Sequence, residues 1–403
     1  MDSNKPKLRF FETSAGQRHV LAHDRYLYAN AAPERRVGII GCGTIGQEHM
    51  RVTRLLGRAT VGGIFDTQPA SMQVALDNDA GHEPVPVCWG SLDEAIADDS
   101  IDAFFVCTPN DTHLAVFEAV LASGKPVFCE KPMATTIDDA ARMVKLVLDY
   151  GAHVQIGLQY RYKAPYAEAR FEALDRQSIG AIKTISMCEY RPPFLDKVEQ
   201  WNKFAVRSGG TLVEKCCHYF DLMNLFAGAR PARVFASGGQ AVNFLDLEYA
   251  GKRSDIDDHG FVIVEYHNGV RANFTLNMFS PGFSEELILC GSRGRLVAGE
   301  RFDFLHDDRA RSTLRVEMPE PYATRKTQVD YPHVIESSGH HGATFFEHAA
   351  FFDHLDGHQT HSATPEDGLT SVLVASAAQQ SIQSGAPVSI DSLIEQHHLA
   401  ALL

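Results

Sequence analysis

The feature that most constrains the fold is a glycine-rich turn between a short apolar run and a helical pattern. Residues 37–40 lead into Gly41-x-Gly43-x-x-Gly46, and a helical pattern follows. In such a turn the first glycine lets the chain leave a strand, the second lets a pyrophosphate approach the backbone, and the third allows close helix–strand packing. A diphosphate then lies at a helix N-terminus, where free N–H groups and the helix dipole favour an anion.

A carboxylate lies at the spacing that this turn requires for dinucleotide binding. The apolar run 61–65 ends in Asp66, which is 20 residues beyond Gly46. An acid there binds the ribose hydroxyls of NAD and repels the 2′-phosphate of NADP, and residues 67–69 provide no arginine for that phosphate. A purely structural glycine turn is the alternative. The sequence predicts an NAD site with these cofactor contacts: Gly41, Gly43, Thr44, Ile45, Gly46 and Asp66.

The pattern over residues 37–158 alternates short apolar strands with helices. Continuous apolar strands between helices indicate a parallel sheet that is covered on both faces. Ligands of such sheets bind outside the carboxyl ends of the strands. Asp66, the segment Thr108-Pro109-Asn110 and the pair Glu130-Lys131 all follow predicted strands. We therefore expect a Rossmann domain over 37–158.

The pattern changes after residue 158. A strand is predicted at 182–190, and Asn268-Gly269 indicates a hairpin between strands 261–266 and 270–276. Further strands are predicted at 287–290, 296–298 and 314–318, and two helices, 343–355 and 365–384, close the chain. Residues 159–403 are thus expected to form an α+β domain with an open, mostly antiparallel sheet. The overall class is α/β.

Composition narrows the possible partners. The 403 residues suit two domains, and the net charge of −14 disfavours nucleic acid and anionic membrane surfaces. No apolar run has the length needed to span a membrane, and no signal peptide is recognised. Eight scattered cysteines without CxxC pairs favour a reduced, cytoplasmic setting. Residues 1–36 are interpreted as an N-terminal arm packed on the body or on a neighbouring subunit.

A helix is predicted after Gly209-Gly210, and it carries two acids and a histidine. Glu214 and His218 are four residues apart, and Asp221 follows three residues later. These spacings place all three on one face of a continuous helix. A solvated polar face would show the same pattern, so this helix by itself does not decide between a surface and a site.

Together these motifs resemble the glucose–fructose oxidoreductase / inositol dehydrogenase / MocA (Gfo/Idh/MocA) family. The resemblance rests on the glycine turn, Thr108-Pro109-Asn110-x-x-His113, Glu130-Lys131-Pro132, Gly209-Gly210 and the acid-x-x-x-His-x-x-Asp helix. Residues 365–388 also look like the closing helix of this family. The resemblance implies an NAD-dependent oxidoreductase acting on a secondary hydroxyl of a sugar, glycoside or cyclitol. It also implies a cis Lys131–Pro132 bond.

The catalytic assignments follow from that resemblance. Lys131, Glu214 and His218 map onto the residues that meet over the nicotinamide in the family. Neutral His218 would act as the base, Lys131 would stabilise the alkoxide, and Glu214 would bind a neighbouring hydroxyl or hold the histidine. The chain departs from the family in carrying glutamate rather than aspartate at 214, and Cys216 where a small residue is common. Lys215 is interpreted as structural or subunit-facing.

The remaining assignments are less specific. Cofactor contacts are also expected from Thr108, Asn110, His113, Glu130 and Arg161; a hinge role is the alternative for Arg161. Substrate contacts are expected from Asp221, Arg191 and Trp201, although Trp201 also suits a core anchor. The histidines between 340 and 361 match no tight ligand spacing, so no metal is expected.

Two other functions share the same motifs. One is a closed-cycle oxidoreductase that keeps NAD(H) bound, and the other is a non-catalytic, dinucleotide-sensing regulator. The presence of both Lys131 and His218 disfavours the regulator. A dimer or tetramer that pairs through the open sheet is expected from the resemblance.

Overall fold

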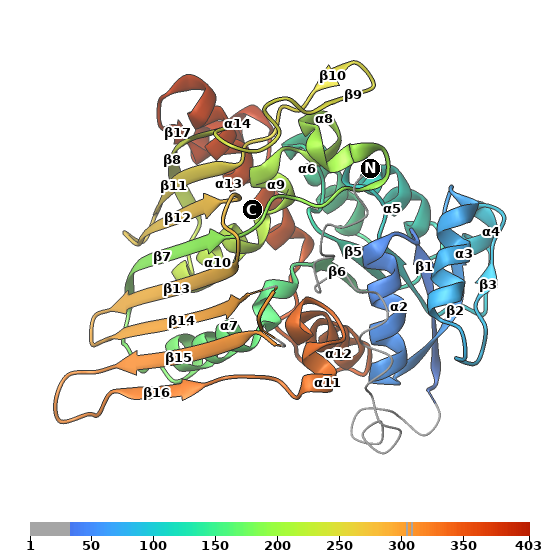
Figure 1. Cartoon of the computed structure of the whole chain (residues 1–403), viewed down its shortest axis with the longest axis horizontal. Coiled ribbons are helices and arrows are strands. Elements are labelled where there is room, and N and C mark those ends of the chain that lie inside the picture. The colour runs from blue at the N-terminus through green and yellow to red at the C-terminus, as the bar shows by residue number, and fades with distance from the viewer. Residues whose placement is uncertain (1–32, 304, 308) are drawn as a thin grey trace.

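The computed structural model describes residues 33–303, 305–307 and 309–403. Figure 1 shows two sheets at opposite ends of the molecule, with helices between them. The first strand begins at Arg35, two residues before the predicted start. Nearly all of the predicted N-terminal arm, residues 1–32, lies outside the described residues.

The first sheet is a parallel Rossmann sheet with the strand order β3-β2-β1-β4-β5-β6. Its strands are β1 (Arg35–Ile40), β2 (Ala59–Phe65), β3 (Val87–Cys88), β4 (Ala103–Val106), β5 (Val127–Glu130) and β6 (Val154–Gly157). The connecting helices are α2 (Thr44–Leu56), α3 (Pro69–Asn78), α4 (Leu92–Ile96), α5 (His113–Leu121) and α6 (Ile137–Val147). The strand order reverses between β1 and β4, which is where such sheets bind dinucleotides.

The second sheet has nine strands in the order β16-β15-β14-β13-β7-β12-β11-β8-β17. Every neighbouring pair is antiparallel except β7 with β12, so the predicted mostly antiparallel sheet is confirmed. The strands are β7 (Ile182–Tyr190), β8 (Pro231–Gly239), β11 (His259–Tyr266), β12 (Arg271–Asn277), β13 (Phe283–Gly291), β14 (Arg295–Phe302), β15 (Arg311–Glu317), β16 (Arg325–Gln328) and β17 (Val388–Ser389). A separate hairpin joins β9 (Glu248–Tyr249) to β10 (Lys252–Arg253).

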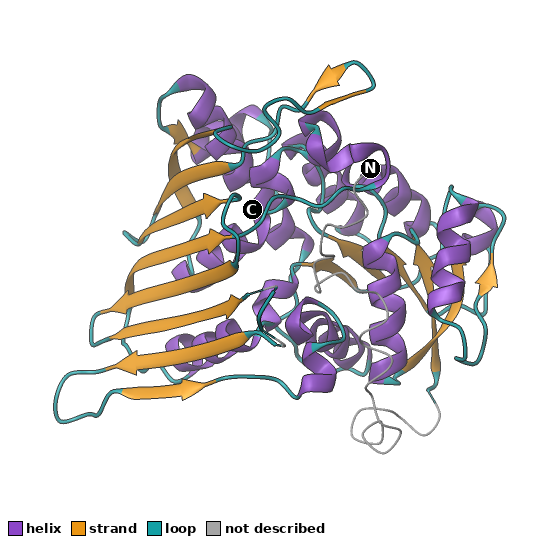
Figure 2. Cartoon of the chain, viewed as in Figure 1, coloured by secondary structure: helices purple, strands orange, loops and turns teal. Residues whose placement is uncertain are grey.

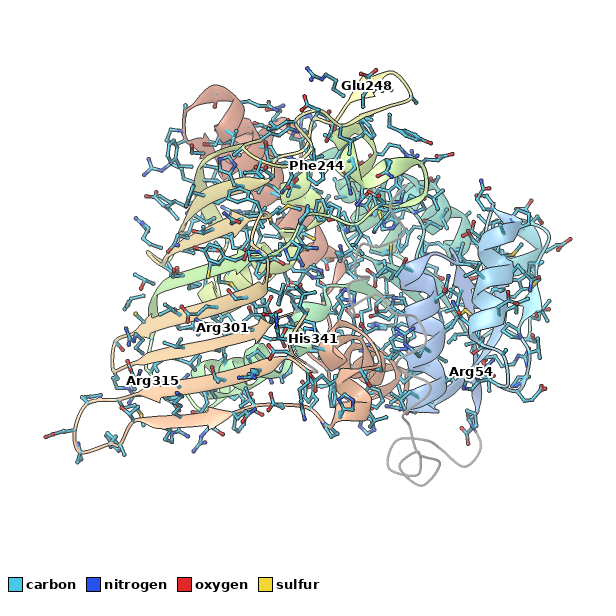
Figure 3. All side chains as sticks on the ribbon, viewed as in Figure 1. Arg54, Phe244, Glu248, Arg301, Arg315 and His341 are labelled. Carbon is cyan, nitrogen blue, oxygen red and sulfur yellow. The ribbon has the colours of Figure 1, made fainter. Side chains whose placement is uncertain are left out.

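The helices of the second half lie mostly between this sheet and the Rossmann domain (Figure 2), and the last of them, α14, packs at the β8–β17 edge of the sheet (Figure 1). They are α7 (Ala164–Arg170), α8 (Ala205–Ser208), α9 (Thr211–Glu214), α10 (Cys217–Ala227), α11 (His333–Glu336), α12 (Ala343–Leu355), α13 (Pro365–Ser384) and α14 (Ile390–Gln396). α12 packs on α2 of the Rossmann domain, and α13 packs on both α6 and β8. His341 lies just ahead of α12, and its Nδ1 atom is 2.5 Å from Glu300 of β14 (Figure 3). No helix in the described part of the chain has the length and apolar character needed to cross a membrane.

Two details of the prediction were wrong. The chain does not close on two helices, because the short helix α14 follows α13. The predicted continuous helix through Glu214, His218 and Asp221 is broken into α9 and α10. The break follows from a wide turn, in which the Cys216 N–H donates to the Thr211 carbonyl five residues back, at 3.4 Å. Glu214 and Asp221 therefore lie on different helices.

Candidate active site

The glycine turn places its three glycines as the pattern predicts. Gly41 has a φ of 99°, and a Cβ there would lie 2.6 Å from the Cys107 carbonyl oxygen. A Cβ on Gly46 would lie 1.9 Å from the Gly41 carbonyl oxygen, so the helix can pack only on a glycine. Among the described residues, no heavy atom lies within 4 Å of a Cβ placed on Gly43. The described part of the chain thus leaves space at the glycine that a pyrophosphate must approach.

The start of α2 is open to an anion. Gly43 is its N-cap residue, so no side chain caps the helix, and its first turn, which includes Thr44 and Ile45, carries no acid. The Asp66 carboxylate accepts hydrogen bonds from the backbone N–H groups of Cys42 and Gln68, both at 2.8 Å. A carboxylate has about four acceptor positions, which leaves capacity for ribose hydroxyls. Uncapped amides, open space and a fixed acid fit a dinucleotide.

Buried polar side chains connect the neighbouring strand ends. His113 places Nε2 2.9 Å from the Thr108 carbonyl oxygen and Nδ1 2.8 Å from the Pro132 carbonyl oxygen. Burial lowers the pKa of His113, which favours its neutral form. The Asn110 side chain donates to the Ser208 carbonyl at 3.1 Å, across to α8. His113 and Asn110 thus hold the loops beside the glycine turn, and their contact with a cofactor remains a proposal.

Lys131 extends from the end of β5 to the broken helix. Its Nζ donates to the Glu214 carbonyl oxygen at 3.0 Å and lies 3.7 Å from the Glu214 carboxylate. The last carbonyls of a helix have no partner within the helix, and the break after Glu214 leaves such a carbonyl for the ammonium. Burial opposes the charged form, but the charge of the Glu214 carboxylate, together with smaller contributions that include Glu130, raises the pKa of Lys131. The Lys131–Pro132 bond is cis, as the resemblance implied.

His218 occupies the first half of α10 as a neutral imidazole. Its side chain is 2 % exposed, and its ring stacks on Tyr160 with centroids 4.1 Å apart. Burial lowers the pKa of His218 well below its usual range, and the charges of Lys131 and Lys215 lower it further. Nδ1 has no hydrogen-bond partner among the described residues. A neutral imidazole has one unprotonated nitrogen, so His218 in this form is suited to accept a proton.

Tyr160 was not predicted as part of the site. It lies in a short 3-10 helix, η4 (Gln159–Tyr162), and its hydroxyl accepts a hydrogen bond from Lys215 Nζ at 2.5 Å. Lys215 also forms an ion pair with Glu189 at 3.2 Å. Lys215 is buried beside the candidate base. Of the two roles predicted for it, structural or subunit-facing, these contacts fit the structural one. The position of Tyr160, directly after the last Rossmann strand, was the only signal available in the sequence.

Three buried glutamates form a row across the large sheet, next to Lys215. They were not predicted from the sequence. Glu189 on β7, Glu285 on β13 and Glu300 on β14 are cross-strand neighbours, each at most 2 % exposed. Lys163 pairs with Glu285 and, at 2.8 Å, with Glu300. The alternation of buried and exposed residues could have revealed them. Each glutamate occupies a position whose side chain faces the interior, two residues from another buried residue of its strand. Glu189, for example, follows buried Met187 by two residues.

Arg161 and Asp221 are paired with each other. Arg161 Nε and Nη2 donate to the two Asp221 carboxylate oxygens at 2.7 and 2.6 Å, and Nη2 also lies 3.0 Å from Asp367. The prediction had assigned Arg161 to the cofactor and Asp221 to the substrate. Their pairing connects η4, α10 and α13. Arg161 is buried, unlike the surface arginine of the hinge alternative, and its contact with a cofactor and that of Asp221 with a substrate stay predictions.

Arg191 and Trp201 belong to a segment that precedes α8. Arg191 lies 3.7 Å from Glu189, and Trp201, in η6 (Val198–Lys203), is 8 % exposed. Lys197 lies over the Trp201 ring at 4.6 Å. Burial opposes the charged form of Glu214, but the charges of Lys131 and then Lys197 outweigh it and lower the pKa of Glu214. Lys197 is thus a further cation of this site that the sequence analysis missed.

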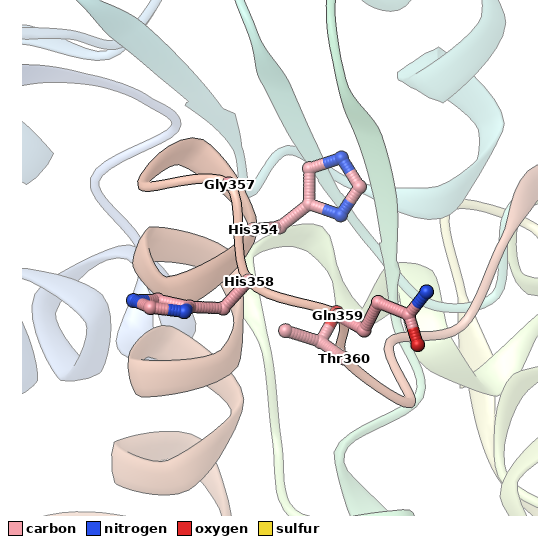
Figure 4. Close-up of a pocket in the computed structure, with 5 residues that line it drawn as sticks. All are labelled: His354, Gly357, His358, Gln359 and Thr360. Atoms are coloured by element: carbon pink, nitrogen blue, oxygen red, sulfur yellow. The ribbon is translucent and has the colours of Figure 1, made fainter.

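A surface pocket of about 420 Å³ lies elsewhere, at the end of α12 (Figure 4). It is lined by His354, Gly357, His358, Gln359 and Thr360. None of these residues belongs to the site at Lys131 and His218. Among residues 33–303, 305–307 and 309–403, no group of three or more His, Cys, Asp or Glu side chains is arranged to hold a metal ion.

The fold and the dinucleotide turn define an NAD-binding oxidoreductase. Residues 35–158 match the oxidoreductase family domain described as an NAD-binding Rossmann fold, and residues 172–390 match the C-terminal alpha/beta domain of the same family. The chain belongs to the Gfo/Idh/MocA family.

Relatives and solved structures agree with this membership. Inositol 2-dehydrogenase of Rhizobium meliloti (strain 1021) is 26% identical over 88% of this chain and 99% of its own length. Myo-inositol 2-dehydrogenase of Thermotoga maritima is 24% identical over 89% and 99%. The crystal structure of levoglucosan dehydrogenase with NADH and levoglucosan has a TM-score of 0.73, with 18% identity over 88% of this chain and 99% of that one. This last likeness shows the fold alone.

Proposed function

We propose that this protein is an NAD-dependent dehydrogenase that oxidises a secondary hydroxyl of a sugar, glycoside or cyclitol. The observation that carries the proposal is the meeting of Lys131, from the Rossmann sheet, with the end of α9 at Glu214, next to the start of α10, which carries His218. The inositol dehydrogenases among the relatives support a polyhydroxylated substrate.

The residues divide the chemistry between them. Bound NAD supplies the hydride acceptor. His218 is neutral, and among the described residues its Nδ1 has no hydrogen-bond partner, so His218 takes the hydroxyl proton. Lys131 carries a positive charge that stabilises the alkoxide as it forms. The Glu214 carboxylate holds the Lys131 ammonium from one side and has a second oxygen, Oε2, without a partner among the described residues, for a neighbouring substrate hydroxyl.

The proposal is tested with a panel of inositols, aldoses, sugar acids and glycosides. Each compound is mixed with enzyme and NAD, and NADH formation is followed by absorbance. Turnover with at least one polyhydroxylated compound is expected. The absence of NADH formation across the whole panel, from enzyme that binds NAD, would overturn the proposed substrate class.

Asp66 sets the cofactor preference in this proposal. Its carboxylate repels the 2′-phosphate of NADP, so removing the charge narrows the preference for NAD by roughly 10-fold or more. Asp66→Asn is the sharper variant, because the amide oxygen can still accept the Cys42 N–H, which Asp66→Ala leaves without a partner. The measurement is kcat/KM with NAD and with NADP for the unmodified enzyme and both variants. Higher efficiency with NADP in the unmodified enzyme would contradict this role.

The outer face of the large sheet is proposed to form a dimer or tetramer interface. Phe261 is 57 % exposed on β11, and Ile263 and Phe235 are cross-strand partners that are 48 % and 40 % exposed. Phe261→Lys is expected to shift the protein to a smaller species in light scattering at micromolar concentration. Val206→Lys on α8, where Val206 is 72 % exposed, is the matched control and should leave the assembly unchanged. A monomeric unmodified protein would contradict the interface.

A further inference from the structure

A chain of buried hydrogen bonds connects α12 to the backbone of Lys131. His348 Nε2 on α12 lies 2.6 Å from His49 Nδ1 on α2. His49 Nε2 lies 2.8 Å from Glu130 Oε1 at the end of β5. The other Glu130 oxygen accepts the backbone N–H of Lys131 at 3.1 Å. This series of hydrogen bonds therefore ends on Lys131, the residue that the proposed function places at the reacting hydroxyl.

The chain is enclosed in apolar surroundings. His49 and His348 are fully buried, and Glu130 is 4 % exposed. The edges of Phe105 and Phe128 face the His49 ring at centroid distances of 5.6 and 5.1 Å. Polar groups in such surroundings are held in one arrangement, because breaking a bond leaves a buried group unsatisfied.

The hydrogen bonds fix the tautomer of each histidine. The Glu130 carboxylate only accepts, so the proton of His49 is on Nε2. We assign both rings as neutral imidazoles with one N–H each, so His49 Nδ1 accepts from His348 Nε2–H. Burial lowers the pKa of His348 well below its usual range. His348 is thus a neutral donor, and its Nδ1 has no partner among the described residues.

Other charged and titratable groups surround this series of hydrogen bonds. Burial and the charges of Glu130 and Glu48 raise the pKa of Glu347, beside His348, well above its usual range, which favours the neutral acid. For Glu130, burial opposes the charged form, but the hydrogen bond from His49 and the charge of Lys131 act against it, and the pKa of Glu130 is lowered. The titratable groups acting on the chain from each neighbouring element are Glu48 on α2, Cys107 after β4, Lys131 after β5, His340 ahead of α12, and Glu347 on α12.

We propose that His49 and His348 are positioning residues for the reaction. They hold the Glu130 carboxylate, ionised and in one rotamer, against the Lys131 backbone, and so fix where the Lys131 ammonium points. The inference rests on the proposed role of Lys131. It also gives α12, which lies in the C-terminal half of the chain, a part in aligning a Rossmann residue.

Two substitutions of His348 separate hydrogen bonding from packing. Glutamine can donate an amide N–H to His49 Nδ1, whereas methionine fills a similar volume and cannot donate. His348→Met is expected to lower kcat about 10- to 100-fold, because a small misplacement of Lys131 costs rate, with the Kd for NAD nearly unchanged. His348→Gln should stay within about threefold of the unmodified kcat.

The rescue by glutamine is a readout that a packing role would not give, because methionine fills a similar volume without the hydrogen bond. Equal kcat values for the methionine and glutamine variants would overturn the proposal.

The outcome is distinct from a failure of the proposed function. If the unmodified enzyme oxidises no compound of the panel, the proposed function fails before any variant is compared. If His348→Met does not fold, ¹⁵N NMR of the unmodified protein still tests the chain. Protons on Nε2 and bare Nδ1 atoms at both His49 and His348 support it, and any other tautomer at either residue overturns it.

Discussion

His218→Ala is expected to turn over about 10²–10⁴ times more slowly than the unmodified enzyme. The substitution removes the only group that the proposal assigns to the hydroxyl proton, and loss of a general base typically has this effect. It leaves the glycine turn and Asp66 intact, so the Kd for NAD should change little. Turnover and NAD affinity measured on the same preparation separate the two contributions.

A matched control is available on α12. His354 is exposed and lines the surface pocket, so His354→Ala removes an imidazole far from the proposed proton transfer. Its rate should equal that of the unmodified enzyme. If His218→Ala turned over as fast as this control, another group would have to be the base.

The burial of His218 should move the fall of kcat/KM at acid pH to lower pH values. Its lowered pKa keeps the imidazole unprotonated as pH falls past the ordinary histidine value of about 6.5. The loss of kcat/KM from protonation of His218 should therefore lie below about pH 6.5. Stability changes in the same direction, because the unfolded chain binds protons at His218 and His348 that the folded chain resists. The free energy of unfolding should fall as pH drops below about 6.5.

Much of the fold could be predicted because its signals are local. The spacing of Gly41, Gly43, Gly46 and Asp66 fixes the dinucleotide turn within one strand–helix–strand unit. The bounds of α12 and α13 match their predictions, because Gly342 precedes one helix and Thr364 caps the other. The bounds of strand β7 also match, and every second residue from Ile185 to Glu189 is buried.

The site was less predictable because its contacts join residues far apart in the chain. The break after Glu214 depends on one wide turn, and the carbonyl it exposes is used by Lys131, 83 residues away. Arg161 and Asp221 pair across 60 residues, and His49 and His348 across 299. Helical periodicity assumes a continuous helix, so it placed Glu214, His218 and Asp221 on one face. It contains no information about contacts with residues far away in the sequence.

Lys131→Met is expected to lower kcat about 10²–10³-fold, the second large effect. Methionine keeps most of the side-chain length but has no charge to stabilise the alkoxide and no N–H for the Glu214 carbonyl. The Kd for NAD should stay within a few-fold, because the turn and Asp66 hold the dinucleotide. The matched variant is Lys131→Arg, which keeps the charge but changes its geometry, and it should fall between methionine and lysine.

The double variant His218→Ala/Lys131→Met tests whether the two side chains act on one proton transfer. Groups that act as a unit show strong non-additivity, so the double variant should be far less impaired than the product of the two single effects. A multiplicative loss would mean that the two residues serve separate steps. A near-normal rate for Lys131→Met would instead mean that another cation near the Glu214 carboxylate orients the substrate hydroxyl. Lys197 would then be the first to test, because its charge also lowers the pKa of Glu214 against the effect of burial.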